Sequence, residues 1–340
     1  MRRVTRRRFL SVAAGIAASA GLGRYLNHEV RSHDWPIVRR STFALGAEVS
    51  FVARHRDASC AERAIDAAIS EVRLVEELMS LYRADSQLSI LNRDGRLGSP
   101  HPYLVEVLEH AEQVSRQTEG AFDITVQPLW QVYSAAAQLG AVPDSTQISE
   151  LQANVDWRQV ACSRQEVRFH RPGMRMTLNG IAQGYAADRA AAAFVAHGVE
   201  HALVNTGEIR ALGESDRNVA WSVGVQHPRS VDEYLAIATL DGRALATSGD
   251  YATRFTSDAR HHHILDPRSG RSPDELCSVS ILAQSGMEAD SLSTACFVLG
   301  VDKSMDLIAK LPGVDALFMR KDGEAVWTAG FPVHHCGKVS

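Results

Sequence analysis

The chain has few cysteines and lacks the sequence motifs of several common protein classes. It contains five cysteines in 340 residues, an odd number, and no CxxC pair. Neither a disulfide framework nor a cysteine-ligated zinc site is therefore expected. The net charge of −4 shows no excess of basic residues, so we expect no nucleic-acid partner. The motifs GxGxxG and GxSxG are both missing, which argues against a Rossmann nucleotide site and against a serine nucleophile.

The N-terminus is basic and then turns apolar. Paired arginines followed by x-Phe-Leu, seen here at 6–10, are typical of twin-arginine export. The apolar stretch 9–20 is too short to span a bilayer, which needs about 20 residues, and Ala18-Ser19-Ala20 offers a small-residue cleavage site. We predict a twin-arginine signal peptide at 1–20, a linker at 21–40 and a periplasmic location. A retained N-terminal anchor stays open, so any membrane contact would come through this segment or through a partner.

The remaining sequence predicts an α+β fold with largely antiparallel sheets flanked by helices. Apolar residues recur at helical spacing in 60–80, and further helices are expected at 102–117, 123–140, 181–197 and 287–299. Residues 82–99 are expected as a polar loop. Short strands are expected at 41–54, 166–171, 174–178, 201–205, 207–212, 219–225, 235–240, 243–248, 260–265, 276–284, 315–320 and 324–328. Asp241-Gly242 is a hairpin signal between two of them. Helices and hairpins are segregated along the chain, which favours α+β over a doubly wound parallel fold.

A candidate cation site lies in the segment 285–294. Ser285 and Glu288 have the spacing of a capping box, so a helix should begin there. Asp290 and Thr294 are then one turn apart on the same face. A carboxylate and a hydroxyl are hard oxygen donors that, with a backbone carbonyl and phosphate oxygens, suit Mg²⁺. A plain polar helix face is the alternative.

Two further segments could carry chemistry. Residues 261–263 are three consecutive histidines, and neighbouring strand residues point to opposite faces. They cannot all serve one ion, so a single inward histidine acting as a base or ligand is the stronger interpretation. In 177–185 a glycine precedes a helix, whose N-terminus could receive an anion such as a pyrophosphate. For the histidines the alternative is an exposed polar strand, and for 177–185 it is an ordinary strand-to-helix turn.

Eight segments, taken in order, resemble the ApbE family of FAD:protein FMN transferases. The resemblance runs from about residue 42 to 331, and it implies a transferase domain over 41–334. The segments are 45–46, 79–83 with Ser89, Leu91 and Asn92, 120–123, 180–186 with Asp188 and Arg189, 202–205 with Ile209 and Arg210, 246–251, 263–270, and 287–290 with Thr294 and Ala295. Each segment is weak alone, but the eight in this order are specific.

The resemblance implies a set of roles. It implies that the flavin donor FAD is bound by Leu45, Tyr82, Ala121, Phe122, Asp123, Thr177, Gln183 and His263. It implies a Mg²⁺ site, with Mn²⁺ as an alternative, formed by Asp290, Thr294 and the backbone carbonyl near Gly180. His263 matches the base that deprotonates the acceptor hydroxyl. The acceptor would be a Thr or Ser on a partner protein with an FMN-binding domain, and AMP would leave.

The chain departs from the family pattern at a few positions. The family commonly has an acid where Thr177 stands, and Lys or Glu where Gln183 stands, and its Gly-Gly-Asp is shortened to Gly207-Glu208. The variant over 177–185 resembles the subgroup that matures the nitrous oxide reductase system (NosX-like). Two other functions remain open at this stage: hydrolysis of FAD to FMN and AMP, and non-catalytic flavin binding by an assembly factor.

Overall fold

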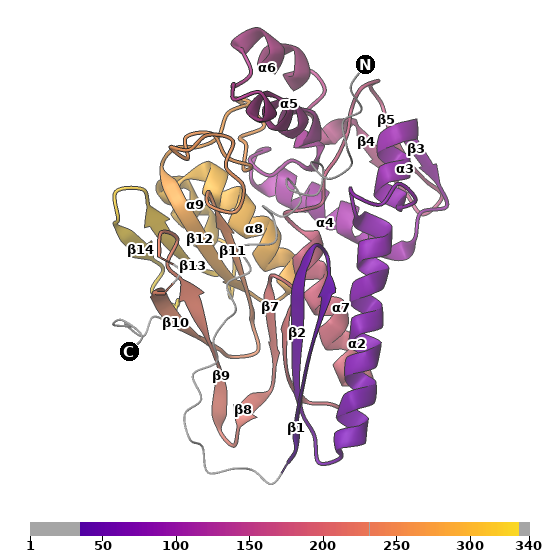
Figure 1. Cartoon of the computed structure of the whole chain (residues 1–340), viewed down its shortest axis with the longest axis vertical. Helices are drawn as coiled ribbons and strands as arrows, with labels where there is room; N and C mark the ends of the chain where they lie inside the picture. Colours follow the sequence, from indigo (N-terminus) through magenta and orange to yellow (C-terminus); the bar gives the residue numbers. More distant parts are fainter. Residues whose placement is uncertain (1–34, 231, 333–340) are drawn as a thin grey trace, which may run out of the picture.

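An eight-stranded antiparallel sheet runs through the middle of the molecule (Figure 1). The computed structural model describes residues 35–230 and 232–332. Every neighbouring strand pair in this sheet is antiparallel. The strands, in spatial order, are β1 (Ile37–Ala44), β2 (Ala47–Arg54), β6 (His201–Asn205), β7 (Ile209–Leu212), β11 (Ala244–Gly249), β12 (Leu276–Ala283), β13 (Asp315–Arg320) and β14 (Ala325–Trp327). The α+β class with antiparallel sheets, predicted from the sequence, is confirmed.

The inner strands of this sheet are buried on both faces, because side chains of alternate residues enter two different cores. Phe51 and Val204 belong to the core under the helices, whereas Val52 and Leu203 belong to a second core on the other face. That second face is covered by a three-stranded sheet in the order β10-β9-β8. Its strands are β8 (Glu214–Asp216), β9 (Val219–Gln226) and β10 (Tyr234–Leu240).

Helices cover the first face of the large sheet. The long helix α2 (Ala58–Met79) lies along one side of the molecule and packs on α7 (Ala182–Ala196) (Figure 1). Helix α8 (Gly286–Leu299) packs on α7 and on strands β11 and β12. The remaining helices are α3 (Gln87–Asp94), α4 (Pro102–Gln117), α5 (Gln127–Gln138), α6 (Ser145–Gln152) and α9 (Val301–Ile308), with the 3₁₀ turns η2 (Ile124–Val126) and η3 (Trp157–Gln159).

A small apolar cluster lies at the end of the molecule where α5 and α6 sit. It contains Tyr133 and Ile148 from these helices, together with Leu265 and Phe255 from the segment between β11 and β12. The rings of Tyr133 and Phe255 stack at 5.5 Å. This cluster holds the histidine-containing segment against α5 and α6. A third sheet, in the order β3-β5-β4, is formed by β3 (Arg96–Gly98), β4 (Val160–Cys162) and β5 (Glu166–Phe169).

The helices were predicted more accurately than the strands. The expected strand 41–54 is a hairpin, β1 and β2, that turns at Leu45 and Gly46, both with positive φ. The expected loop 82–99 contains α3 and β3, and the predictions of strands at 174–178 and 260–265 were wrong, since neither segment forms a named strand. Asp241-Gly242 does not close a hairpin, because β10 and β11 on its two sides belong to different sheets.

The N-terminal predictions lie mostly outside the described residues. The expected signal segment 1–20 and most of the expected linker are not described, but β1 begins at Ile37, so residues 37–40 belong to the sheet rather than to a linker. Over 35–230 and 232–332, no helix is both long and apolar enough to cross a bilayer.

Candidate active site

The N-terminus of α8 is fixed by two side-chain caps. Ser285 is the N-cap, and its side chain accepts a hydrogen bond from the Glu288 N–H at 3.1 Å, as the sequence predicted. Asp188 on α7 accepts from the N–H groups of Gly286 at 2.7 Å and Met287 at 2.9 Å. A carboxylate at a helix N-terminus satisfies orphan donors and complements the helix dipole. Asp188 therefore sets the position of α8 relative to α7.

Two glycines let α7 and α8 approach closely. A Cβ on Gly184 would lie 2.0 Å from the carbonyl oxygen of Gly286, and a Cβ on Gly286 would lie 2.4 Å from the carbonyl oxygen of Gly184. This contact brings Asp290 against α7, where its Oδ2 accepts from the Gly184 N–H at 3.0 Å. One turn further along α8, Thr294 lies beside Gly180, since a Cβ there would be 2.8 Å from its Oγ1. The structure thus brings Asp290, Thr294 and Gly180 together.

Strands β7 and β11 add oxygen atoms to the same region. Ser248 Oγ lies 3.2 Å from Thr294 Oγ1 and 2.7 Å from Ser293 Oγ. Glu208, which directly precedes β7, accepts from the Thr247 N–H at 3.1 Å and is only 8% exposed. A Cβ on Gly207, next to Glu208, would lie 2.5 Å from Nε2 of Gln183, which places Gln183 at the edge of this group. The region is rich in hard oxygen donors.

Burial shapes the electrostatics of these carboxylates. Burial, with the charge of Asp188 added, raises the pKa of Asp290 to about 7. Burial and the charge of Asp290 raise the pKa of Glu208 well above its usual value. Within the described residues Asp290 forms no ion pair. A cation at this point would compensate the negative charge that burial penalises.

The donor set fits a small hard cation held jointly with a substrate. Asp290 supplies a carboxylate, Thr294 a hydroxyl, and Gly180 a backbone carbonyl, which are ligand types that Mg²⁺ accepts. In the described part of the chain, no three His, Cys, Asp or Glu side chains lie close enough together to hold a metal ion. A site with one protein carboxylate is typical where substrate phosphates complete the coordination of Mg²⁺.

His263 is presented by an irregular hairpin rather than by the strand we expected. Its backbone N–H donates to the Thr253 carbonyl at 3.0 Å, and its Nδ1 lies 3.2 Å from the same oxygen. Because a carbonyl only accepts, Nδ1 must carry the proton, which leaves Nε2 as a free acceptor. Burial lowers the pKa of His263, so the imidazole is neutral near pH 7. Neutral Nε2 is the form that can take a proton.

His262 is the inward histidine of the three. It is fully buried, its ring meets Phe297 of α8 edge-on at 5.4 Å, and its Nε2 lies 3.0 Å from the Pro273 carbonyl. Since Phe297 is about one turn beyond Thr294, His262 ties the hairpin to the helix that carries the oxygen cluster. His262 therefore anchors the hairpin to α8.

The residues expected to bind flavin occupy three places. Phe122 lies next to Gly180, 3.5 Å from a Cβ built there, so it borders the oxygen cluster. Asp123 caps η2 and accepts from Thr125 and from the Trp157 N–H at 3.1 Å, so its carboxylate holds the loop that contains Ala121 and Phe122. The N–H of Thr177 donates to the Ile124 carbonyl at 2.8 Å, which joins the loop to the segment before α7.

Leu45 and Tyr82 lie on different elements from this cluster. Leu45 is in the β1–β2 turn with φ 54, and its N–H donates to Glu76 on α2 at 2.8 Å. Tyr82 follows α2, and 68% of it is exposed. The exposed aromatic ring is free to stack on a flat heterocycle. None of their polar contacts reaches Asp290 or Thr294.

Sequence reasoning missed three residues of the site: Glu208, Ser248 and Asp188. All three stand in or next to segments that resembled the family, but none had been given a role. The sequence holds no local pattern that would have found them. Glu208 and Ser248 come close to α8 only through sheet pairing, and Asp188 only through helix packing.

Two solved structures share this fold, and one of them is described as a flavin transferase. The chain superimposes on the ApbE protein of Thermotoga maritima with a TM-score of 0.76 at 27% identity, covering 86% of this chain and 97% of the other. For the flavin transferase ApbE of Vibrio cholerae the TM-score is 0.73 at 26% identity, covering 87% and 98%. The fold, together with a buried oxygen-donor site, therefore defines the flavin transferase class.

The family assignment agrees with this class. The model of the ApbE family matches residues 45–318, and the chain belongs to that family. An FAD:protein FMN transferase of Treponema pallidum is 32% identical over 299 residues, which cover 81% of this chain and 82% of the relative. The chain is accordingly an enzyme of the FAD:protein FMN transferase class.

Proposed function

We propose that the chain uses Mg²⁺ to transfer FMN from FAD to a Thr or Ser hydroxyl of a partner protein. The acceptor oxygen attacks the phosphorus on the riboflavin side of the pyrophosphate, and the bond from that phosphorus to the bridging oxygen breaks. AMP leaves with the bridging oxygen, and the proton of the hydroxyl passes to a base. The observation that carries the proposal is the meeting of Asp290, Thr294 and Gly180 where α7 and α8 touch, next to Phe122.

The chain's own residues divide the work. Nε2 of His263 accepts the proton of the acceptor hydroxyl, because its Nδ1 is committed to Thr253 and the ring is neutral. Phe122 and Tyr82 contact the flavin, with Leu45, Ala121, Thr177 and Gln183 lining the rest of the FAD site. Asp123 supports this lining by holding its loop. Asp290 and Phe122 are buried, which limits the access of water that would compete with the acceptor.

Asp290, Thr294 and the carbonyl of Gly180 would hold the cation. Bound there, Mg²⁺ would neutralise charge that develops on the pyrophosphate oxygens. Mn²⁺ also favours oxygen ligands and is the alternative ion.

The acceptor and the cellular setting are part of the proposal. The twin-arginine pattern at 6–10 supports a periplasmic enzyme. The variant at 177–185 supports a NosX-like role, with an FMN-binding domain of a membrane-bound flavoprotein as acceptor and nitrous oxide respiration as the setting.

Two alternatives share the same site. If water replaces the protein hydroxyl, the products are free FMN and AMP. If Thr177 in place of an acid prevents chemistry, the protein binds flavin without turnover. Incubation of the full chain with FAD, Mg²⁺ and a purified FMN-binding acceptor domain separates them. Covalent FMN on the denatured acceptor, detected by mass spectrometry, is expected. Free FMN alone indicates a hydrolase, and unchanged FAD indicates a binding protein.

Replacing Asp290 tests the cation site within that assay. Asp290→Asn keeps an oxygen that can accept from Gly184 but removes the charge, so the rate of FMN transfer should fall at least about a hundredfold. Asp302→Asn, an exposed change on the neighbouring helix α9, is the matched control and should stay within about twofold. Equal rates for the two variants would show that Asp290 does not hold the ion.

A further inference from the structure

The segment between β11 and β12, residues 250–275, folds back on itself as a short irregular hairpin. Thr253 pairs with His263, as described above, and the Phe255 N–H donates to the His261 carbonyl at 2.8 Å. An isolated bridge joins Arg254 and His262 between these two pairs. We call residues 253–263 the histidine hairpin. His263 is the last residue of this hairpin, so the placement of its imidazole depends on the placement of the whole hairpin.

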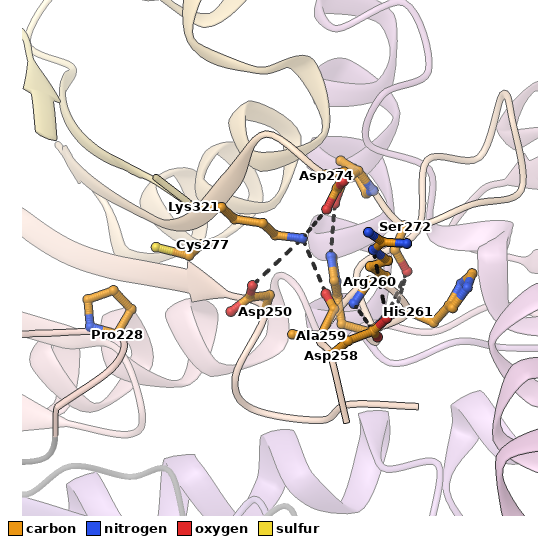
Figure 2. Close-up of polar contacts among 12 residues, drawn as sticks. Pro228, Asp250, Asp258, Ala259, Arg260, His261, Ser272, Asp274, Cys277 and Lys321 are labelled. Carbon is orange, nitrogen blue, oxygen red and sulfur yellow. Dashed lines mark hydrogen bonds and ion pairs between the residues drawn. The ribbon is translucent and has the colours of Figure 1, made fainter. Parts of the chain in front are cut away.

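One lysine from another part of the fold contacts this segment at three points. Lys321 directly follows β13, and its Nζ donates to the Ala259 carbonyl at 3.2 Å and to Asp274 at 2.6 Å (Figure 2). The same Nζ lies 4.0 Å from Asp250 Oδ2. These partners stand at the start, the tip and the end of the segment. Figure 2 shows the side chain of Lys321 reaching between Asp250, Ala259 and Asp274.

The start of the segment 250–275 is held by Arg229 and β12 as well as by Lys321. Asp250 is fully buried and forms a bidentate pair with Arg229, at 2.6 and 2.7 Å. Its N–H also donates to the Cys277 carbonyl of β12 at 3.1 Å. A bidentate arginine pair fixes both distance and orientation. Asp250 would therefore stay in place if Lys321 were removed, and the histidine hairpin that follows it would be the part that loses a contact.

The backbone is strained at the tip of the hairpin, where Lys321 donates a hydrogen bond to the Ala259 carbonyl. Ala259 has φ 56, in the left-handed region that residues other than glycine rarely adopt, and it is buried. Such a conformation persists only where surrounding contacts hold it. A charge-assisted hydrogen bond from Lys321 to the carbonyl of Ala259 is a contact of that kind.

We propose that Lys321 is a positioning residue for the general base His263. It does not contact the imidazole. Its hydrogen bond holds the tip of the histidine hairpin near β13 and thereby maintains the Thr253–His263 pairing. That pairing orients Nε2. This inference rests on the proposed function only in naming His263 as the base. That Lys321 holds the hairpin in place is a statement about structure alone.

The kinetic test compares substitutions that remove or keep the positive charge. Lys321→Met should lower kcat for FMN transfer about tenfold or more, because misplacement of a base slows the proton transfer. KM for FAD should change by less than about twofold, since Lys321 does not reach the flavin residues. Lys321→Arg, which retains charge and donors, should recover most of kcat. Asp274→Asn, at a side chain that is 70% exposed, removes one contact without endangering the fold and should give a smaller loss.

Lys310→Met is the matched control, because Lys310 is an exposed lysine just beyond the end of α9. It should transfer FMN at the rate of the unsubstituted chain. The proposal is overturned if Lys321→Met also keeps that rate, if it raises KM for FAD with kcat unchanged, or if Lys321→Arg is as slow as Lys321→Met.

A second measurement tests, without any turnover, whether Lys321 holds the hairpin in place. Amide hydrogen exchange of the full chain, followed by mass spectrometry, should be faster over 253–263 in Lys321→Met and unchanged over α2. Equal exchange of this peptide in both proteins would overturn the proposal. If the unsubstituted chain transfers no FMN, the proposed function fails, while the exchange data still decide whether Lys321 pins the hairpin.

Discussion

The adjacent histidines His262 and His263 differ in exposure and in the partners of their ring nitrogens. His262 is completely buried against Phe297, and burial lowers its pKa to about 4. His263 keeps Nε2 available because Nδ1 faces the Thr253 carbonyl. The sequence favoured a single inward histidine acting as a base or ligand, and the fully buried one of the three is His262. The sequence could not show that the inward one is the anchor, because no strand forms at 260–265 and strand alternation does not apply there.

The buried neutral His262 should make the protein sensitive to acid. The folded state resists protonation of His262 until about pH 4, whereas the unfolded chain takes up the proton near its ordinary pKa of 6.5. Stability from this group is therefore complete above pH 6.5 and is lost as the pH falls from there towards 4. Between about pH 7 and about pH 5 the loss from His262 should be roughly 2 kcal/mol.

Urea denaturation at the two pH values measures this loss. His262→Gln cannot titrate but can still donate to the Pro273 carbonyl, so its free energy of unfolding should fall less over the same interval. His170→Gln, a change at an exposed histidine, should behave like the unsubstituted chain. A pH dependence in His262→Gln equal to that of the unsubstituted chain would contradict the assignment.

At the scale of the elements, the site depends on how closely α7 and α8 approach. A glycine inside a helix normally costs about 1 kcal/mol relative to alanine, so Gly184→Ala would stabilise an isolated helix. In the folded protein the added Cβ would meet the Gly286 carbonyl oxygen at 2.0 Å. Since both atoms belong to packed helices, the helices must separate, and the clash outweighs the gain in propensity.

Gly184→Ala should lower the free energy of unfolding by about 2–3 kcal/mol. It should also reduce FMN transfer, because Asp290 accepts from the Gly184 N–H. Gly98→Ala is the control, since a Cβ there meets nothing within 4 Å, and its effect should be about 0.5 kcal/mol or less. Chemical denaturation of both variants gives the comparison, and similar values would show that the helices tolerate the methyl group.

The elements also show what local patterns could and could not predict. The helices at 58–79, 102–117, 182–196 and 286–299 were expected within a few residues, because helical periodicity and caps are local signals. The prediction of a hairpin at Asp241-Gly242 was wrong because a turn sequence indicates a change of chain direction and does not show which strands pair. Asp290 and Thr294 were predicted to share a helix face from their spacing, and both lie on α8. Glu208 and Ser248 come close to them only through β7 and β11.

At the scale of the whole molecule, two buried carboxylates oppose the stability of the fold when they are charged. Asp290 and Glu208 are carboxylates enclosed by packed helices and strands, and each is penalised by burial. Apolar burial in the two cores on either face of the eight-stranded sheet offsets this cost. Removing one buried charge while keeping its hydrogen bond should therefore favour the folded state when no cation is bound.

Asp290→Asn should have opposite effects on stability without and with Mg²⁺. Without the ion, the variant should be about 1–2 kcal/mol more stable than the unsubstituted chain, since the repulsion on Glu208 disappears. With Mg²⁺ at about a hundredfold its dissociation constant, the unsubstituted chain should gain about 2.7 kcal/mol by mass action and the variant should gain nothing. The order of the two proteins would then reverse. Thermal denaturation with and without Mg²⁺, with Asp302→Asn as the control, measures both effects. A Mg²⁺-induced gain of equal size in Asp290→Asn would place the ion elsewhere, and a loss of stability in the ion-free variant would show that the carboxylate supports the fold.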